Sequence, residues 1–397
     1  MKKRVLIPLF LINFIVYFIG TGLLPILPLY ASRFGVSSTG IGLYIAFIFA
    51  AITLGTVLTG RIAHHFSTRS IFLVAGLLGI PALALLGRSS GFWQVVLLTA
   101  AIWFLAGVGT ALVNVQAGLH AARDKRGQSF GLMFLALPAA SLVAGLTMGR
   151  LVELGSYRFM FDLLAIIWAA WPFLAVLGPN ERLGPDERPE PGLSPTTTPA
   201  GKGRPALSTL FYLLVVTTLL SATTFYLARL GTSFSLAFLG FSPSAVASTT
   251  AVGGLVALPA TYLISTLSDR LGRKHIVILG YVFAVSAAVT MSVAGDLWHF
   301  WLATAMLYMS RSINGSVAPA LATDLLTREN LVRGLPYLSA GNWLAAVFGS
   351  AIAGIGIDNL GQMNLFLLAA GLAAAAALLM GILPISRRAM TMASLQA

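Results

Sequence analysis

The sequence predicts an all-α integral membrane protein in which twelve transmembrane helices form two pseudo-symmetric six-helix bundles. Three observations predict this fold: the apolar composition, the length of the apolar runs and an internal repeat. Hydrophobic residues make up 57% of the 397 residues, charged residues make up 9%, and the mean hydropathy is +0.88. Soluble domains are about 45–50% apolar and about 25% charged, and a soluble fold of this size could not bury so much apolar surface. The composition therefore places the chain in a bilayer.

Twelve apolar runs are each long enough to cross a membrane as a helix, which takes roughly 20 residues. The runs are continuous rather than alternating, which disfavours a β-barrel. The first run continues from Val5 to about Tyr30. It exceeds the roughly 7–15 residues of a signal-peptide core, so we expect it to remain as a membrane helix. The predicted spans are 5–31, 39–63, 70–88, 92–121, 127–152, 157–178, 207–232, 243–267, 275–294, 297–325, 332–356 and 362–385.

A polar segment separates the sixth span from the seventh. Its sequence, GPNERLGPDERPEPGLSPTTTPAGKGRP at 178–205, is rich in Pro, Gly and charge, which is typical of a flexible linker. The chain is therefore expected to comprise an N-terminal six-helix bundle at 1–178, a cytoplasmic linker at 179–205 and a C-terminal six-helix bundle at 206–397.

The distribution of Lys and Arg predicts that both termini are cytoplasmic. With the N-terminus inside, 19 of the 25 basic residues fall in cytoplasmic segments, as the positive-inside rule requires. The net charge of +13 thus reports topology, and nucleic-acid binding is not expected. The six other basic residues are Arg33, Arg88, Arg150 and Arg158 near the outer surface, and Arg229 and Arg311 within spans.

The two halves of the sequence align with a constant offset of 205 residues. After the tenth span the offset becomes 207, so that Arg126 meets Arg333. Parallel six-span repeats are one architecture of secondary transporters, with the substrate near mid-membrane between the halves. Aligned pairs in the first part of the repeat include Trp93 with Trp298, Leu97 with Leu302, and Thr99 with Thr304.

The loop between the eighth and ninth spans concentrates charge in an otherwise apolar chain. It reads DRLGRK from Asp269 to Lys274. This pattern resembles the signature loop of the major facilitator superfamily, and a more divergent counterpart in the first half runs from Gly60 to Arg69. The resemblance extends over the whole chain and implies the major facilitator fold.

In that superfamily such residues latch the two halves together while the cavity faces outward. The alternative is simple anchoring by positive charge, which would need neither the acid nor the glycine. The predicted latch residues are Gly60, Arg69, Asp269, Arg270, Gly272, Arg273 and Lys274.

Polar groups within spans are costly in a bilayer and are therefore functional candidates. Asn13 and Tyr17 share one face of the first span, and Asn114 lies in the fourth. The resemblance implies that spans one, four, seven and ten line a central cavity, where these side chains would contact substrate. The alternative is hydrogen bonding between helices, worth about 0.6 kcal/mol on average.

An unpaired arginine at mid-depth costs at least about 2.5–3.5 kcal/mol. Arg311 lies near the middle of the tenth span, and no Asp or Glu lies at comparable depth. We expect Arg311 to face the cavity and bind an anionic group; alternatively, it bonds helix carbonyls near Pro319. Arg229 is expected to reach the outer interface. The full predicted substrate-binding set is Asn13, Tyr17, Asn114, Tyr226, Arg311, Asn314, Asn342 and Trp343.

Span five carries Gly145 and Gly149, a spacing that allows close contact between helices. It resembles a degraded form of the glycine–proline motif of the antiporter branch, with Leu146 in place of proline. Glu153 and Asp162, near the outer surface, are expected to form a structural ion-pair network with neighbouring arginines. The alternative is proton coupling, for which these two carboxylates are the candidates.

The resemblance implies a secondary transporter that moves a small organic solute by alternating access, with proton-coupled efflux of amphipathic compounds as the first hypothesis. The alternatives are a transporter of a small organic anion that uses Arg311, and a non-transporting membrane receptor or scaffold. The sequence contains no nucleotide loop, nucleophile elbow or metal-spaced His cluster, so no enzyme activity, cofactor or metal is expected. The expected partners are a small-molecule substrate and membrane lipids. The expected form is a monomer in a bacterial-type inner membrane.

Overall fold

The computed structural model describes residues 3–120, 126–177, 209–326 and 328–382, and within them the chain forms eleven helices and no strand. This confirms the all-helical part of the prediction. The predicted linker at 179–205 lies outside the described residues. The helices are α1 (Lys3–Ser32), α2 (Ser38–His65), α3 (Thr68–Leu86), α4 (Phe92–His120), α5 (Arg126–Gly155), α6 (Tyr157–Leu177), α7 (Thr209–Phe238), α8 (Pro243–Leu271), α9 (Arg273–Ser292), α10 (Leu297–Leu325) and α11 (Arg328–Ile382).

The structure has one helix, α11, where the sequence predicts two spans. The break between them is a single residue, Gly361, whose φ of 73° and ψ of 176° lie outside the helical region. Ten helices of the described chain are long and apolar enough to cross a membrane, and α10 is the exception. Its polar run from Ser310 to Asn314 lowers its apolar content.

Serine side chains start corresponding helices of the two halves. Ser37 caps α2 by accepting from Gly40 N at 3.2 Å, and Ser242 caps α8 by accepting from Ala245 N at 3.3 Å. Such caps satisfy backbone N–H groups that have no partner in the first helical turn. Ser37 and Ser242 stand 205 residues apart, which is the offset of the sequence repeat.

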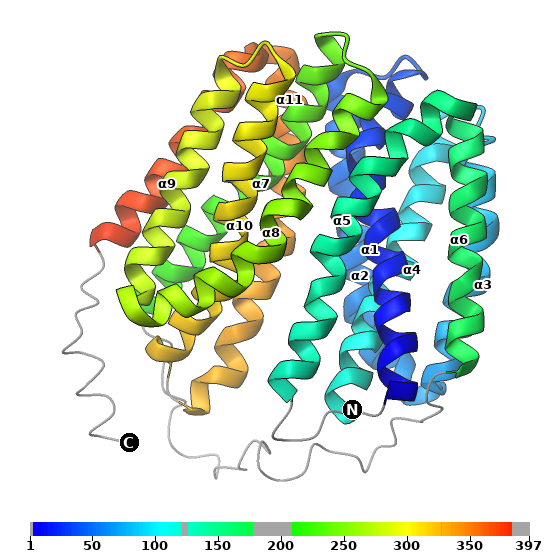
Figure 1. The fold of residues 1–397 in the computed structure, drawn as a ribbon, viewed down its shortest axis with the longest axis horizontal. Helices are drawn as coiled ribbons and strands as arrows, with labels where there is room; N and C mark the ends of the chain where they lie inside the picture. Colours follow the sequence, from blue (N-terminus) through cyan, green and yellow to red (C-terminus); the bar gives the residue numbers. More distant parts are fainter. Residues whose placement is uncertain (1–2, 121–125, 178–208, 327, 383–397) are drawn as a thin grey trace.

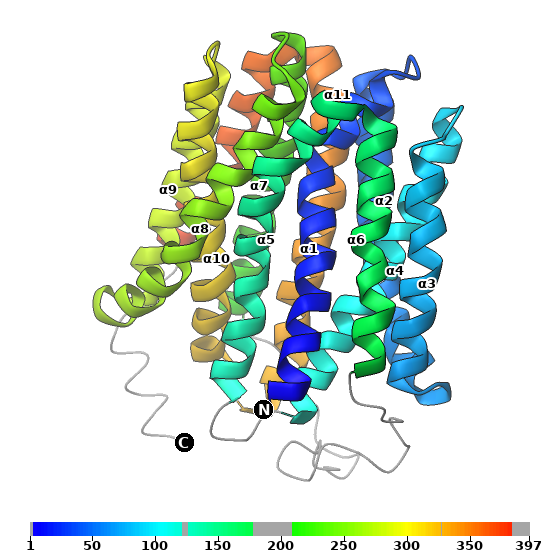
Figure 2. The same ribbon diagram turned by 45° about the vertical axis from the view of Figure 1, so that its right-hand side comes forward.

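The helices run side by side along one direction, with α8, α9 and α10 on one side of the molecule and α3, α4 and α6 on the other (Figure 1). We call the end where α1 ends and α2 begins, at Ser32–Ser38, the distal end, and the end where α1 begins the proximal end. Helices α5 and α8 lie close together at the distal end and diverge toward the proximal end (Figures 1 and 2).

Two helix pairs make the most extensive contacts between the first six helices and the rest: α5 with α8, and α2 with α11. Glycines allow the backbones to touch in both pairs. A Cβ on Gly145 would collide with Ala251 of α8, and a Cβ on Gly42 would lie 2.6 Å from the Cα of Gly354 in α11. Such contacts strengthen helix association in a bilayer through van der Waals packing. Because these residues lie toward the distal end, the structure is closed there.

Large aromatic side chains fill the centre of the first six helices. Trp168 and Trp171 of α6 are fully buried, with ring centroids 4.8 Å apart. The Trp168 indole donates to the carbonyl of Gly76 in α3 at 3.0 Å, which satisfies its buried N–H. This core makes α3 and α6 one packed unit.

Replacement of Gly361 by alanine should destabilise the protein by on the order of 1–3 kcal/mol, because a Cβ is strained at that φ and ψ. Thermal unfolding in detergent measures the effect. Gly371→Ala is the matched control, because Gly371 lies within the helix and a Cβ there meets no neighbour within 4 Å. Equal unfolding temperatures for the two variants would contradict the account of the break.

Replacement of Gly145 by valine should open the distal end, because the added atoms cannot fit against Ala251. The chain has no cysteine, so a single Ser350→Cys probe, at a position only 1% exposed, can be followed with a thiol reagent. We expect the probe to react several-fold faster in the Gly145→Val background. Gly371→Val is the control, and an unchanged rate for Gly145→Val would show that the contact does not keep this end closed.

Candidate substrate site between the two halves

Two small voids flank the side chain of Arg229. The first, with a cavity volume of about 10 Å³, lies among α7, α8 and α10. The second, with a cavity volume of about 20 Å³, lies between the first six helices and the rest, with Phe49 on one side and Tyr226 on the other. Each is far smaller than the roughly 300–1,000 Å³ of a drug-sized ligand site, so a substrate of that size enters only when the helices around Arg229 move apart. The lining residues are Arg229, Thr232, Thr249, Thr250, Thr304, Leu307 and Tyr308 for the first void, and Leu24, Ile45, Phe49, Tyr226, Arg229, Leu230 and Ser350 for the second.

Arg229 lies deeper in the bundle than its sequence context suggests. Helix α7 continues to Phe238 rather than ending near residue 232, which leaves Arg229 about 14 Å from the helix end at 1.5 Å per residue. Its Nη2 donates to the carbonyl of Thr21 in α1 at 3.2 Å. The prediction that Arg229 reaches the interface was therefore wrong, because the extra helical turns carry that interface away from it.

Arg311 lies halfway along α10 and is half-buried. Its guanidinium carbon is 5.6 Å from the centroid of the Phe225 ring, a cation–π contact. Phe225 also packs edge-on against Tyr308 of the first void, with centroids 5.3 Å apart. Among the described residues, neither Arg229 nor Arg311 forms an ion pair with a carboxylate. Both guanidinium groups thus leave positive charge uncompensated near the voids.

Tyr226 is the predicted substrate residue of the second half that lines a void. Its ring packs edge-on against Phe49 across the interface between the halves, with centroids 5.1 Å apart. Asn342 donates to the Tyr226 hydroxyl at 3.5 Å, and Asn314 donates to Ser221 Oγ at 2.9 Å. In this part of the described structure the buried Oδ1 atoms of Asn314 and Asn342 have no hydrogen-bond partner. Trp343 is half-buried against the hydrophobic core.

The predicted residues of the first half lie apart from these voids. Asn13 is 4% exposed, and its Nδ2 donates to the carbonyl of Met133 in α5 at 3.1 Å. Tyr17 is half-buried and Asn114 is exposed, and neither lines either void. The contact of Asn13 supports the alternative role of hydrogen bonding between helices.

The predicted latch residues lie at the proximal end, and the contacts described for Arg273 and Lys274 are to other helices of the second half. Gly272 joins α8 to α9 with φ of 93°, a conformation that favours glycine. Arg273 forms an ion pair with Asp324 of α10 at 2.7 Å, and Lys274 donates to the carbonyl of Gly381 at 2.9 Å. The side chain of Asp269 lies outside the described residues. Arg270 lies in the last turn of α8 and is exposed, Gly60 lies in α2 and Arg69 lies in α3.

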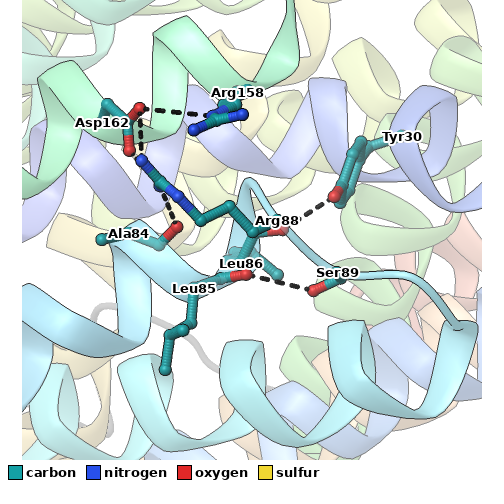
Figure 3. A network of polar contacts seen from close by, with 8 residues as sticks. All are labelled: Tyr30, Ala84, Leu85, Leu86, Arg88, Ser89, Arg158 and Asp162. Atoms are coloured by element: carbon teal, nitrogen blue, oxygen red, sulfur yellow. Dashed lines mark hydrogen bonds and ion pairs between the residues drawn. The ribbon is translucent and has the colours of Figure 1, made fainter.

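Asp162 belongs to an ion-pair network at the distal end (Figure 3). Its Oδ2 accepts from Arg88 Nη2 at 3.0 Å and lies 4.0 Å from Nε of Arg158. The hydrogen bond from Arg88 to this carboxylate raises the pKa of the Arg88 guanidinium above its ordinary value. Nearby, the Tyr30 hydroxyl donates to the Leu86 carbonyl at 2.7 Å. These contacts support the structural role that the sequence predicts for Asp162.

Glu153 does not join that network. It accepts from the backbone N of Ser244 at 2.9 Å and from its Oγ at 2.6 Å, at the start of α8. Asp358, which sequence reasoning missed, accepts from Thr39 N at 2.7 Å and from its Oγ1 at 2.8 Å, at the start of α2. The signal that could have found Asp358 is its place 205 residues after Glu153.

Sequence reasoning also missed the hydroxyl lining of the first void. The lining threonines Thr249 and Thr250 are buried and come from α8, a helix not expected to line the cavity. The pairing of Thr304 with Thr99 in the repeat was visible in the sequence but has no chemical signature. No cluster of three metal-ligating residues occurs among the described residues.

The sequence profile of the Major Facilitator Superfamily matches residues 9–239 and 214–391. The chain is 22% identical over 337 residues to multidrug resistance protein MdtG of Proteus mirabilis, covering 80% of each chain. It is 25% identical over 367 residues to multidrug resistance protein MdtG of Enterobacter lignolyticus, covering 87% of this chain and 84% of that one.

Solved structures share the fold. A bacterial homologue of the human lysosomal transporter Spinster, in an inward-facing and occupied conformation, superposes with a TM-score of 0.74 at 15% identity over 95% of both chains. A POT family transporter in complex with 5-aminolevulinic acid gives a TM-score of 0.73 at 14% identity over 95% of both chains. The profile covers well over half of the sequence, the helices are of membrane-spanning length, and the relatives are transporters rather than enzymes. This chain is an integral membrane protein that belongs to the Major Facilitator Superfamily.

Proposed function

We propose that this transporter exports amphipathic organic compounds across a bacterial inner membrane by alternating access. The observation that carries the proposal is the position of Arg229, which lines both voids and bonds across the interface between the halves. A substrate there touches both halves and is released when they rock apart. The multidrug resistance proteins among the relatives support an efflux role.

The membrane topology belongs to the same proposal. We place the proximal end and both termini in the cytoplasm, because most Lys and Arg residues fall on that side. Counting α11 as two spans on either side of Gly361 gives twelve spans in two pseudo-symmetric bundles, at 1–178 and 206–397. The proximal latch residues are proposed to join the halves when the distal end opens, and the transporter is proposed to act as a monomer in lipid.

The charge of the site bears on the class of substrate. Arg229 and Arg311 both lie within the bundle, and the described residues offer no carboxylate partner for either. Uncompensated positive charge in a low-dielectric site repels cations and attracts anions. Leu24, Phe49 and Tyr226 supply an apolar and aromatic wall. The site therefore suits neutral or anionic amphipathic compounds better than lipophilic cations.

Transport of a small organic anion is the second candidate function, favoured by the same uncompensated charges. It differs from the first in needing little apolar contact. A non-transporting receptor or scaffold is the third, and it predicts no flux of any compound.

The driving force is proposed to be an inward proton gradient, as the resemblance to drug:proton antiporters implies. Glu153 and Asp162 remain the sequence-based candidates, although both side chains bond to partners at the distal end. Among the described residues, no carboxylate lies at the depth of Arg229 and Arg311. The proposal therefore assigns no route for protons through the site.

Purified protein in proteoliposomes should move a neutral and an anionic amphipathic dye faster than protein-free liposomes, and faster with an inward proton gradient than without one. A cationic dye of similar size should move least, because the site is positive. Dye accumulation followed by fluorescence makes the measurement. Equal dye movement in liposomes with and without protein would exclude transport and favour a non-transporting receptor or scaffold.

Replacement of Arg229 by glutamine should raise the KM for the anionic dye on the order of tenfold, because one charged hydrogen bond to the substrate is lost. Arg311→Ala should raise it as well if Arg311 contacts the anionic group. Arg33→Gln, which removes an exposed arginine at the distal end, is the matched control. Unchanged kinetics in both variants would place the substrate elsewhere.

A further inference from the structure

The carboxylates of Glu153 and Asp358 each cross from one half of the molecule to the other. Glu153 stands near the end of α5 and binds Ser244, the second residue of α8. Asp358 stands in α11 and binds Thr39, the second residue of α2. Each carboxylate accepts both the backbone N–H and the side-chain hydroxyl of its partner.

The internal repeat relates the two contacts. Glu153 and Asp358 stand 205 residues apart, and so do Thr39 and Ser244. The carboxylate of the first half thus binds the helix start of the second half, and the carboxylate of the second half binds the helix start of the first. The same contact therefore occurs twice, once in each direction between the two halves.

The chemistry of each contact favours an ionised carboxylate. Backbone N–H groups in the first turn of a helix lack partners within the helix, and the helix dipole places partial positive charge there. Hydrogen bonds to an ionised acceptor are shorter and stronger than neutral ones. The hydroxyl distances of 2.6 Å at Ser244 and 2.8 Å at Thr39 agree with this. Both carboxylates are exposed to solvent, where a carboxylate is ionised at neutral pH.

Each contact also depends on close packing of the two halves. A Cβ on Gly149 would collide with Ser244, and a Cβ on Gly354 would collide with Ser38. These glycines are 205 residues apart as well. The carboxylates therefore reach their partners only when the distal ends of the halves touch, and rocking the halves apart breaks both contacts.

We infer that Glu153 and Asp358 form a pair of crossed latches that hold the distal end closed and set how often the transporter opens on that side. This inference rests on the alternating access of the proposed function. It gives Glu153 a positioning role, in which the ionised side chain holds two helices together. The Asp358 latch does the same on the opposite edge of the interface. Neither the contact of α5 with α8 nor that of α2 with α11 then opens alone.

Spin-label distance measurements on the full-length protein in lipid nanodiscs test the latches without any substrate. The cysteine-free chain allows labels at Ser90→Cys and Gly295→Cys, which are exposed positions 205 residues apart in distal loops of the two halves. We expect a short distance to dominate. In Glu153→Gln/Asp358→Asn, a longer distance should gain on the order of tenfold in relative population, as loss of two charge-assisted contacts predicts.

Asp162→Asn is the matched control, because it neutralises a distal carboxylate whose partners, Arg88 and Arg158, lie in its own half. Its distance distribution should equal that of the wild type. Thr39→Ala/Ser244→Ala removes only the donor hydroxyls and should shift the populations in the same direction but by less. This second double variant tests the latches even if Glu153→Gln/Asp358→Asn folds poorly. An unchanged distribution in both double variants would overturn the latches.

The outcomes separate this inference from the proposed function. If the distances shift as expected but no dye is exported, the latches stand and the export proposal fails. If dye is exported and the distances do not shift, export stands and the latches are wrong.

Discussion

A guanidinium group placed well inside a membrane-spanning bundle needs an electronegative partner, and this requirement governs the centre of the molecule. Arg229 meets it with the carbonyl of Thr21 in α1, which has no partner four residues on in its own helix because that residue is Pro25 and lacks an N–H. One carbonyl cannot satisfy five N–H donors. The Arg229 side chain also lines both small voids, of which one lies within the second half and the other at the contact between the two halves. The charge therefore lies next to the contact between the halves.

At the distal end, the two halves meet where α5 contacts α8 and where α2 contacts α11. Glycines bring α5 onto α8 and α2 onto α11 so closely that the backbones touch. That approach aligns helix starts of one half with carboxylates of the other. A centre that must exchange solutes with water on two sides needs ends that can separate. Small residues with a few polar contacts provide such an end, because they pack without interlocking side chains.

Much of the fold could be predicted from the sequence, because apolar runs of membrane length have few alternative structures. The polar lining of the site could not. The depth of Arg229 depends on where α7 ends, and the apolar pattern does not mark that end near Phe238. The role of Asn13 depends on which helix faces it, and α5 presents a carbonyl there. The function of Asp358 depends on a helix start more than 300 residues away, and only the repeat carries a hint of it. The sequence also did not reveal that a single residue, Gly361, separates the last two predicted spans. The described residues therefore form eleven continuous helices where twelve spans were expected.

The central claim is that substrate binds beside Arg229, between the halves. A thermal-shift screen of the purified wild type against a library of amphipathic compounds identifies ligands, since a ligand that binds the folded state raises its unfolding temperature. The same compounds are then applied to Arg229→Gln. The account predicts that anionic ligands that stabilise the wild type no longer stabilise the variant, while the variant itself remains folded. An equal rise in unfolding temperature for both proteins would contradict it.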